Sequence, residues 1–254
     1  MIRTERADTL LTVVLSRPDA ANALTPTMVC QLGVVLRDAG QLTDVRVIIL
    51  RGEGSRAFSA GYDIASIPEG DQEFEPEKVM NSAIESIEGC PKPVIAMIEG
   101  HCVGFGCDLA LACDLRIAAL NARFAIPPAR LGNVYPLPGI QRLLRTMGRA
   151  GVQELLLTGQ SIGADRALEL GMVQRAVAPE NLLEETYKLA RLIGNSAPLA
   201  LAATKAIVRE LSRSIEVEHL SSLQLLVEQV RASRDAVEGK RAFLEKRAPR
   251  FAGE

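Results

Sequence analysis

The sequence predicts an α/β fold that ends in a helical region, and three observations carry this prediction. Two apolar, strand-like runs at 10–15 and 45–50 flank a stretch in which apolar residues have helical spacing. The alternation of strand and helix continues with a helical stretch at 78–88 and a short apolar run at 94–98. From Gln141 onward the pattern is almost wholly helical. Strand–helix alternation followed by helices favours an α/β core with helices appended to it.

The first predicted unit is a β-α-β arrangement. Thr25 is placed to cap its helix, and Pro26 suits the first helical position. The second strand, Val45–Leu50, is almost entirely apolar, which is typical of a strand covered on both faces. The helix between the strands presents one apolar face, formed by Met28, Leu32, Val35 and Leu36.

Loops and short elements are predicted for the middle of the chain. The segment Gly52–Asp63 is a glycine-punctuated loop, and Ile67–Glu77, rich in proline, glycine and acids, is expected to be exposed. The glycine-rich stretch Gly100–Gly106 follows the 94–98 strand. After it we expect an apolar helix at 107–112, a strand at 114–118 and a proline-rich loop at 127–138.

The C-terminal helices are predicted to form a region of their own. Leu220, Leu223, Val227 and Val230 make one apolar stripe, and a last helix is expected at 236–246. A boundary near 196–198 separates a core of residues 1–195 from a helical region of residues 196–254. A region of this size is small for an independent domain, so we expect it to pack on the core or on a neighbouring subunit.

Composition excludes several functional classes. The chain has 254 residues, with 29 Lys and Arg against 31 Asp and Glu, a balance that argues against binding nucleic acid through bulk charge. No apolar run approaches the length of a membrane span, and the start of the chain lacks the apolar stretch of a signal peptide, so we expect a cytoplasmic protein. Five cysteines without a C-x-x-C pair indicate reduced thiols. With two histidines, a metal site is not expected.

Two glycine-containing loops are candidates for ligand binding. The loop 57–64 follows a buried strand, where α/β folds bind ligands, and Ala60-Gly61 would let another molecule approach the bare N–H of Tyr62. The stretch 100–108 precedes an apolar helix, whose N-terminus favours negative charge. A purely structural interpretation stays open for each loop: a tight turn for 57–64 and a glycine-lined crossing of a helix and a strand for 100–108. A dinucleotide fingerprint fits poorly because Leu109 stands where a third glycine is needed.

Asp108 and Tyr135 are the candidate polar groups for chemistry. Asp108 lies one turn inside the apolar helix, so it either has a raised pKa and serves as an acid or base, or forms a salt bridge with an arginine. Asp114 is more simply a cap or turn residue. Tyr135 lies in a rigid proline loop, where it either hydrogen-bonds a substrate or packs its ring in the core. No Ser/His/Asp arrangement is recognisable.

Together these features resemble the enoyl-CoA hydratase/isomerase (crotonase) superfamily. The resemblance implies a spiral of β-β-α units followed by a helical trimerisation region, commonly in a dimer of trimers. It implies an acyl-CoA thioester as substrate, with coenzyme A as part of the substrate and no separate cofactor. The matching stretches run in the family's order: 15–24, 57–64, 92–113, 157–160 and 243–247.

The resemblance also implies roles for individual residues. The backbone N–H groups of Tyr62 and Phe105 would form the oxyanion hole that holds the thioester oxygen as it takes on enolate charge. Lys246 would be a partner for a CoA phosphate, either in its own subunit or in a neighbouring one. The adenine and pantetheine contacts map onto Ala20, Ala21, Ala60 and Ile64.

Departures from the family pattern bear on the reaction. Hydratases use two glutamates, but this chain has Asp108 at the first position and Pro128 at the second. Proline has no acid–base group, so a standard hydratase is not expected. Phe105 replaces a common glycine, and its ring is expected to narrow or reshape the acyl pocket. Asp19 stands where many relatives carry lysine, which removes a charge contact with CoA.

Within the superfamily the sequence is most similar to the methylmalonyl-CoA decarboxylase-like branch. The similarity lies in the stretches 58–64 and 131–137, and includes Tyr135; the branch's histidine at the oxyanion loop is here Tyr62. We therefore expect an acyl-CoA lyase that decarboxylates a malonyl-type CoA thioester through an enolate. Two alternatives stay open: an enoyl-CoA hydratase or isomerase that uses Asp108, and a non-catalytic acyl-CoA-binding protein.

Overall fold

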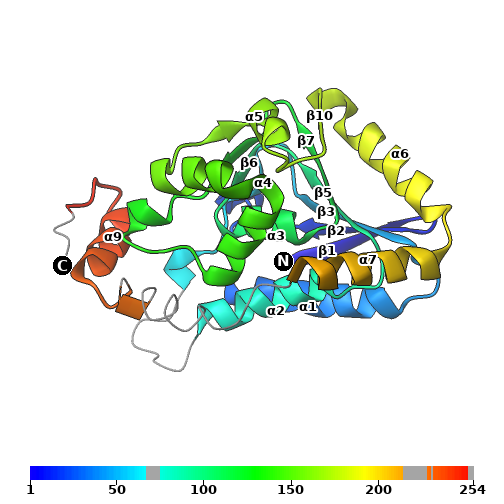
Figure 1. Ribbon diagram of the computed structural model, residues 1–254, viewed down its shortest axis with the longest axis horizontal. Helices are drawn as coiled ribbons and strands as arrows, with labels where there is room; N and C mark the ends of the chain where they lie inside the picture. Colours follow the sequence, from blue (N-terminus) through cyan, green and yellow to red (C-terminus); the bar gives the residue numbers. More distant parts are fainter. Residues whose placement is uncertain (67–74, 214–227, 230, 251–254) are drawn as a thin grey trace.

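A computed structural model of the chain shows two sheets built by a repeating β-β-α unit (Figure 1). It describes residues 1–66, 75–213, 228–229 and 231–250. In each unit the first strand joins a six-stranded sheet and the second joins a smaller four-stranded sheet. The units are β3-β4-α2, β5-β6-α3 and β7-β8-α4. The predicted spiral of β-β-α units is thus confirmed.

The large sheet runs in the order β1-β2-β3-β5-β7-β10. Only its first pair is antiparallel; the remaining pairs are parallel, as chain crossovers through helices require. Its strands are Ile2–Ala7, Leu10–Leu15, Val47–Gly52, Val94–Ile98, Leu115–Ala119 and Arg175–Val177. The small sheet consists of β4, β6, β8 and β9, which span Ala57–Ser59, His101–Val103, Arg123–Ala125 and Ile162–Gly163.

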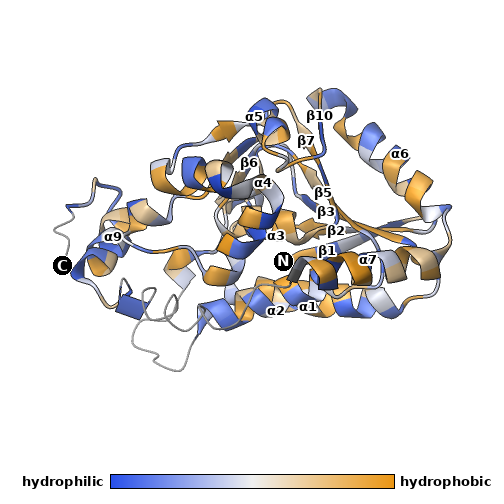
Figure 2. Ribbon diagram, viewed as in Figure 1, coloured by the Kyte–Doolittle hydropathy of each residue, from blue (hydrophilic) through white to orange (hydrophobic). Residues whose placement is uncertain are grey.

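Helices cover both faces of the large sheet. Alternate residues of β3 point to opposite sides: Val47 and Ile49 pack beneath α6, while Ile48 and Leu50 join the main core with α1, α2 and α3. Figure 2 shows that the strands of the large sheet and α3 are mostly apolar, whereas the helices around them mix apolar and polar residues. The helices are α1 (Pro26–Gln41), α2 (Pro76–Glu88), α3 (Phe105–Ala112), α4 (Leu137–Thr158), α5 (Ala164–Glu169), α6 (Leu182–Gly194), α7 (Pro198–Arg213) and α9 (Arg234–Leu244).

The predicted helices and strands occur, but the predicted loop 52–63 and the glycine-rich stretch 100–106 also contain the three-residue strands β4 and β6, which are too short to show periodicity. Thr25 caps α1 by accepting a hydrogen bond from Met28 N, as expected. Strand β1 was not predicted because it is an exposed edge strand, with five of its six residues exposed and therefore no apolar pattern. The region after Gln141 is not wholly helical, since it also contributes β9 and β10, which are too short to show periodicity.

Two predicted features lie wholly or largely outside the described residues. These are the apolar stripe from Leu220 to Val230 and most of the segment 67–77, of which Glu75 onward is described. Within the described part, α2 already begins at Pro76, and α9 begins two residues earlier than expected because Ser233 caps it through Ala236 N. None of the described helices is long and apolar enough to cross a membrane.

Helix α7 is fixed to the core by a buried lysine. The Lys205 ammonium donates to Ile87 O, Lys92 O and Asp114 Oδ2 at 3.0, 3.1 and 2.7 Å. Asp114 Oδ2 also accepts from Val94 N at 2.7 Å, so the residue expected to act as a local cap ties a strand to a distant helix. Because one ammonium satisfies three acceptors, this contact fixes where the C-terminal helices leave the core.

Helix α9 returns to the core through a backbone contact. A Cβ placed on Gly239 would lie 2.1 Å from Leu131 O, and one on Gly132 would lie 2.1 Å from Asp235 O. Both positions are therefore restricted to glycine by the close approach of α9 to the 3-10 turn Pro128–Leu131. This turn also borders the cavity described below.

We expect Gly239→Ala to destabilise the protein by about 1–3 kcal/mol, because a methyl group would overlap a carbonyl oxygen that cannot rotate away. Urea unfolding followed by circular dichroism measures the change. Gly194→Ala is the matched control, since its Cβ would make only ordinary contacts, the nearest at 3.6 Å. Equal stability of the two variants would contradict a tight contact between α9 and the turn.

Candidate active site

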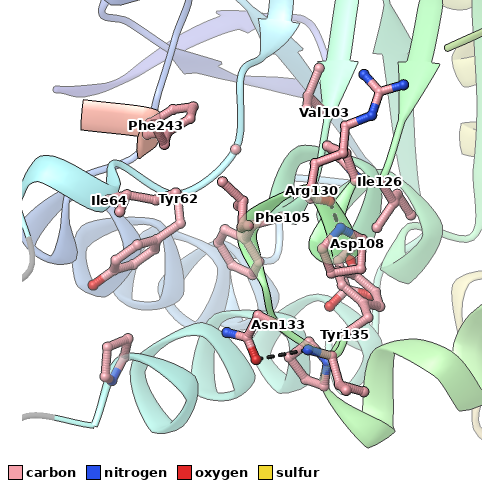
Figure 3. A pocket seen from close by; sticks show the side chains of 18 of the residues that line it. Tyr62, Ile64, Val103, Phe105, Asp108, Ile126, Arg130, Asn133, Tyr135 and Phe243 are labelled. Atoms are coloured by element: carbon pink, nitrogen blue, oxygen red, sulfur yellow. Dashed lines mark hydrogen bonds between the residues drawn. The ribbon is translucent and has the colours of Figure 1, made fainter. Parts of the chain in front are cut away.

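A cavity of about 680 Å³ lies between the core and α9 (Figure 3). Its walls come from the loop after β4, the start of α2, the β6–α3 junction, the turn 128–136 and the chain from α9 onward. Apolar side chains dominate these walls, which is typical of sites that bury most of a small ligand. The lining includes Tyr62, Phe105, Asp108, Pro128, Tyr135 and Phe243.

Two loops meet at the cavity because Gly61 has no side chain. Its φ is +97°, and a Cβ there would lie 2.7 Å from Val103 O and 3.3 Å from Phe105 N. Ser59 Oγ accepts from Gly61 N at 3.1 Å and donates to Asn22 O at 2.9 Å, which holds the loop in this position. The loop residues 60–62 are therefore pressed against the β6–α3 junction.

The N–H groups of Tyr62 and Phe105 have no hydrogen-bond acceptor among the described residues. Phe105 is the first residue of α3, so its N–H is one of those that a helix cannot satisfy internally. Gly104, with φ +53°, makes the turn into this helix. Both residues line the cavity, so a ligand oxygen could accept from two backbone donors near the positive end of a helix dipole.

The rings of Tyr62 and Phe105 form one wall. Their centroids are 6.3 Å apart and their planes meet at 74°, an edge-to-face arrangement. Burial raises the pKa of Tyr62 to about 12, with further contributions from Cys30 and Asp63. The Tyr62 hydroxyl is buried without a hydrogen-bond partner among the described residues. The ring is thus a steric wall, and its phenol stays neutral at physiological pH.

Asp108 is buried in the first turn of α3 and forms an ion pair. Its Oδ1 accepts from Arg142 Nη1 at 2.5 Å, and Arg142 Nε donates to Glu88 Oε1 at 2.8 Å. Burial raises the pKa of the Asp108 carboxyl, Arg142 opposes the rise and Glu88 adds to it. Of the two interpretations that the sequence left open for Asp108, a raised pKa and a salt bridge, the structure shows both.

Tyr135 lies at the bottom of the cavity, near Asp108 (Figure 3). Its ring is 9% exposed, and its hydroxyl donates to Gly104 O at 3.3 Å. Burial and then the nearby Asp108 carboxylate raise the pKa of this phenol well above its ordinary value. Gly139 leaves room for the ring, since a Cβ there would lie 2.5 Å from Cε1. The long bond to Gly104 leaves the phenol proton available to a ligand.

Acidic groups are scarce in this cavity. Among the described lining residues the acids are Asp108 and Glu77, and Glu77 is ion-paired with Arg231. Pro128, at the position of the second family glutamate, lines the cavity and offers neither acid nor base. Asp108 is thus the lining acid that lies near the Tyr135 phenol.

The residues expected to contact CoA fall into two groups. Ala60 and Ile64 line the cavity, and Ala21 lies next to them because its carbonyl accepts from Ala60 N at 2.9 Å. Ala20 ends the neighbouring 3-10 turn Pro18–Ala20. Lys246 follows α9 with an exposed side chain and is not among the residues that line the cavity.

Sequence reasoning missed several cavity residues. Arg130, Phe243 and Arg247 line the cavity, and Arg142 lies directly behind Asp108. Arg142 carried a signal, since a buried acid in an apolar helix needs a cation somewhere in the fold. Phe243 and Arg247 lie in the stretch 243–247 that resembles the family, but their place at the cavity depends on how α9 docks, and Arg130 carried no signal.

Comparisons with known proteins show the family to which the chain belongs. Residues 5–254 match the family model described as enoyl-CoA hydratase/isomerase. The chain is 38% identical to carnitinyl-CoA dehydratase of Escherichia coli O157:H7, over 98% of this chain and 97% of that protein. It is 37% identical to the Salmonella typhi protein of the same name, over 96% and 95% of the two chains.

Solved structures show the same fold. A methylmalonyl-CoA decarboxylase in complex with 2-nitronate-propionyl-CoA is 33% identical, with a TM-score of 0.93 and coverage of 100% of this chain and 98% of that one. An enoyl-CoA hydratase/carnithine racemase from Magnetospirillum magneticum is 32% identical, with a TM-score of 0.79 and coverage of 100% and 96%.

Fold and cavity together define an enzyme that acts on CoA thioesters. The chain belongs to the enoyl-CoA hydratase/isomerase family, within the crotonase superfamily. The family resemblance expected from the sequence is confirmed. Its relatives include dehydratases, a hydratase and a decarboxylase, so membership of the family alone leaves the reaction open.

We expect Gly61→Ala to reduce turnover of an acyl-CoA substrate about 10²-fold, because the methyl group would push the Tyr62 and Phe105 N–H groups apart. Gly54→Ala is the matched control: Gly54 has a similar positive φ of +71° but no atom within 4 Å of the added Cβ. Steady-state kinetics of both variants separate the effect of the contact from backbone strain. Equal losses in the two variants would refute the role of the contact.

Proposed function

We propose that this enzyme is an acyl-CoA lyase that decarboxylates a malonyl-type CoA thioester through an enolate. One observation carries the proposal: the cavity places the Tyr135 phenol and one carboxyl, Asp108, near two unpartnered N–H groups, while Pro128 occupies the place of a second acid. Loss of CO₂ needs no base, because the departing carboxylate supplies the electrons of the enolate. Addition of water needs a group that activates the water.

The Tyr62 and Phe105 N–H groups would form the oxyanion hole. The thioester oxygen gains charge as the bond between the α-carbon and the carboxyl carbon breaks, and two fixed donors stabilise that charge. Such donors are typically worth about 3–4 kcal/mol each in the activation barrier. The supporting observation is that both residues line the cavity, on loops held in contact by Gly61, and that neither N–H has an acceptor among the described residues.

The rest of the cavity suits a carboxylate that must leave. Apolar walls and the nearby Asp108 carboxylate disfavour a negative charge on the bound carboxyl group, and loss of CO₂ moves that charge to the thioester oxygen. The Tyr135 phenol, whose pKa is raised by burial, stays protonated and is placed to donate to the substrate. In the proposed step the carbon–carbon electrons enter the enolate, CO₂ departs, and the α-carbon then takes a proton delivered through Tyr135 from water.

A second candidate is the reversible addition and loss of water with Asp108 as the acid–base group. It is favoured by the carnitinyl-CoA dehydratases to which the chain is 37–38% identical. The buried Asp108 has a pKa raised toward the range useful for proton transfer, which supports the same role. A non-catalytic acyl-CoA-binding role is the third outcome that the assay below distinguishes.

The wider assignments of the family are part of this proposal. Ala20, Ala21, Ala60 and Ile64 would contact the adenine and pantetheine of CoA, and Lys246 a CoA phosphate. Coenzyme A would enter as part of the substrate, with no separate cofactor. A homotrimer or dimer of trimers would cover the apolar side chains that α6 and α7 expose, among them Leu192 at 67%, Leu199 at 84% and Leu211 at 75%.

The first test offers the purified protein methylmalonyl-CoA and crotonyl-CoA in separate reactions, with mass spectrometry of the acyl-CoA products. We expect methylmalonyl-CoA to lose CO₂ and crotonyl-CoA to gain no water, because position 128 is a proline and Glu77, the other acid among the described lining residues, is ion-paired with Arg231. Water added to crotonyl-CoA would support the Asp108-dependent candidate instead. Binding of both thioesters without turnover would support the non-catalytic role.

A second test compares Tyr135→Phe with Asp108→Asn. We expect Tyr135→Phe to lower turnover about 10²-fold or more, because it removes the phenol proton, and Asp108→Asn to lower turnover less. Single-turnover kinetics with the accepted substrate measure both effects. The reverse order would reject the decarboxylase assignment of roles and favour Asp108 as the acid–base group.

A further inference from the structure

Arg142 lies behind the cavity wall rather than in it. Its side chain is 11% exposed, and it is not among the residues that line the cavity, whereas Asp108 is. The ion pair between Arg142 and Asp108 joins helices α4 and α3, and the two residues are 34 positions apart in the sequence. Asp108 thus presents its carboxyl to the cavity while one of its oxygens, Oδ1, is held from behind by a guanidinium.

The same guanidinium is shared with a second carboxylate. Arg142 Nε donates to Glu88 Oε1 at 2.8 Å, and the Glu88 side chain at the end of α2 is 18% exposed. One cation therefore lies between two carboxylates from two helices, and its charge is divided between them. Desolvated ion pairs of this kind interact strongly, since little water screens them.

We propose that Arg142 is a positioning residue that sets the charge state of Asp108 at the cavity wall, and that Glu88 tunes this effect by competing for the same guanidinium. Neither residue touches the substrate in this arrangement. The effect of the Asp108 charge on a substrate rests on the proposed function. A charged Asp108 would repel the carboxylate that leaves as CO₂, or act as the base in a dehydration.

The charges around Asp108 predict opposite effects for its two neighbours. Burial raises the Asp108 pKa, Arg142 lowers it and Glu88 raises it. The Tyr135 phenol also faces Asp108 from the loop before α4, but it is neutral at physiological pH. Removing Arg142 should therefore raise the Asp108 pKa further. Removing the Glu88 charge should lower it, because Arg142 then serves a single carboxylate.

The test is an NMR titration of protein with isotope-labelled aspartate carboxyl carbons, in which Asp108→Asn identifies the Asp108 signal. We expect Arg142→Gln to raise its midpoint by about 1–3 pH units, and Glu88→Gln to lower it. Arg142→Lys should restore part of the shift, since it keeps the charge but loses the forked geometry. The pH midpoint of turnover should move in the same directions.

Arg166→Gln is the control. Arg166 also bridges two carboxylates, Glu154 and Glu169, but this cluster is exposed and does not include Asp108. Arg166→Gln should leave the Asp108 midpoint unchanged. The proposal would be overturned if Arg142→Gln and Glu88→Gln moved the Asp108 midpoint in the same direction. It would also be overturned if folded Glu88→Gln protein showed no shift of that midpoint. If Arg142→Gln does not fold, Glu88→Gln and Arg142→Lys still decide the matter. Because the titration needs no turnover, its outcome is independent of which reaction the enzyme catalyses.

Discussion

The contact between the loop after β4 and the start of α3 is the constraint on which the site depends. Parallel pairing of β4 with β6 brings the two chain segments side by side, and Gly61 allows their backbones to touch. The tight turn leaves the Tyr62 and Phe105 N–H groups without acceptors in the part of the chain that the structure describes. Buried donors without partners are costly, so the fold keeps a site that a ligand oxygen can complete.

Charge burial is the second feature that shapes the cavity. Asp108 is carried into the core by an otherwise apolar helix, where Arg142 from α4 compensates its charge and is shared with Glu88 from α2. Tyr135 packs nearby through a loop that ends at the same helix α4. Because three helices and one loop contribute to this cluster, the chemistry of the site depends on how the β-β-α units stack.

The similarity of this chain to proteins with different reactions has a structural explanation. The loops that carry Tyr62 and Phe105 belong to the repeated β-β-α units, whereas Pro128 and Tyr135 lie on the connection between β8 and α4. That connection is in turn covered by α9 through the paired glycines 132 and 239. Changes in one connection can therefore alter the acid–base groups while the thioester site and the fold stay the same.

The sequence by itself determined the α/β class, the strands β2, β3, β5 and β7, the helices around them, and the family, because buried strands and amphipathic helices leave local patterns. It also singled out Tyr62 through a glycine-containing loop, Asp108 through its place in an apolar helix and Tyr135 through a proline-rich loop. Phe105 was singled out through the resemblance to the family. Only the tertiary structure decided which cation meets Asp108, how closely Gly61 approaches Phe105, and that α9 closes the cavity. These are contacts between residues far apart in sequence, and their partners are set by packing rather than by any local pattern.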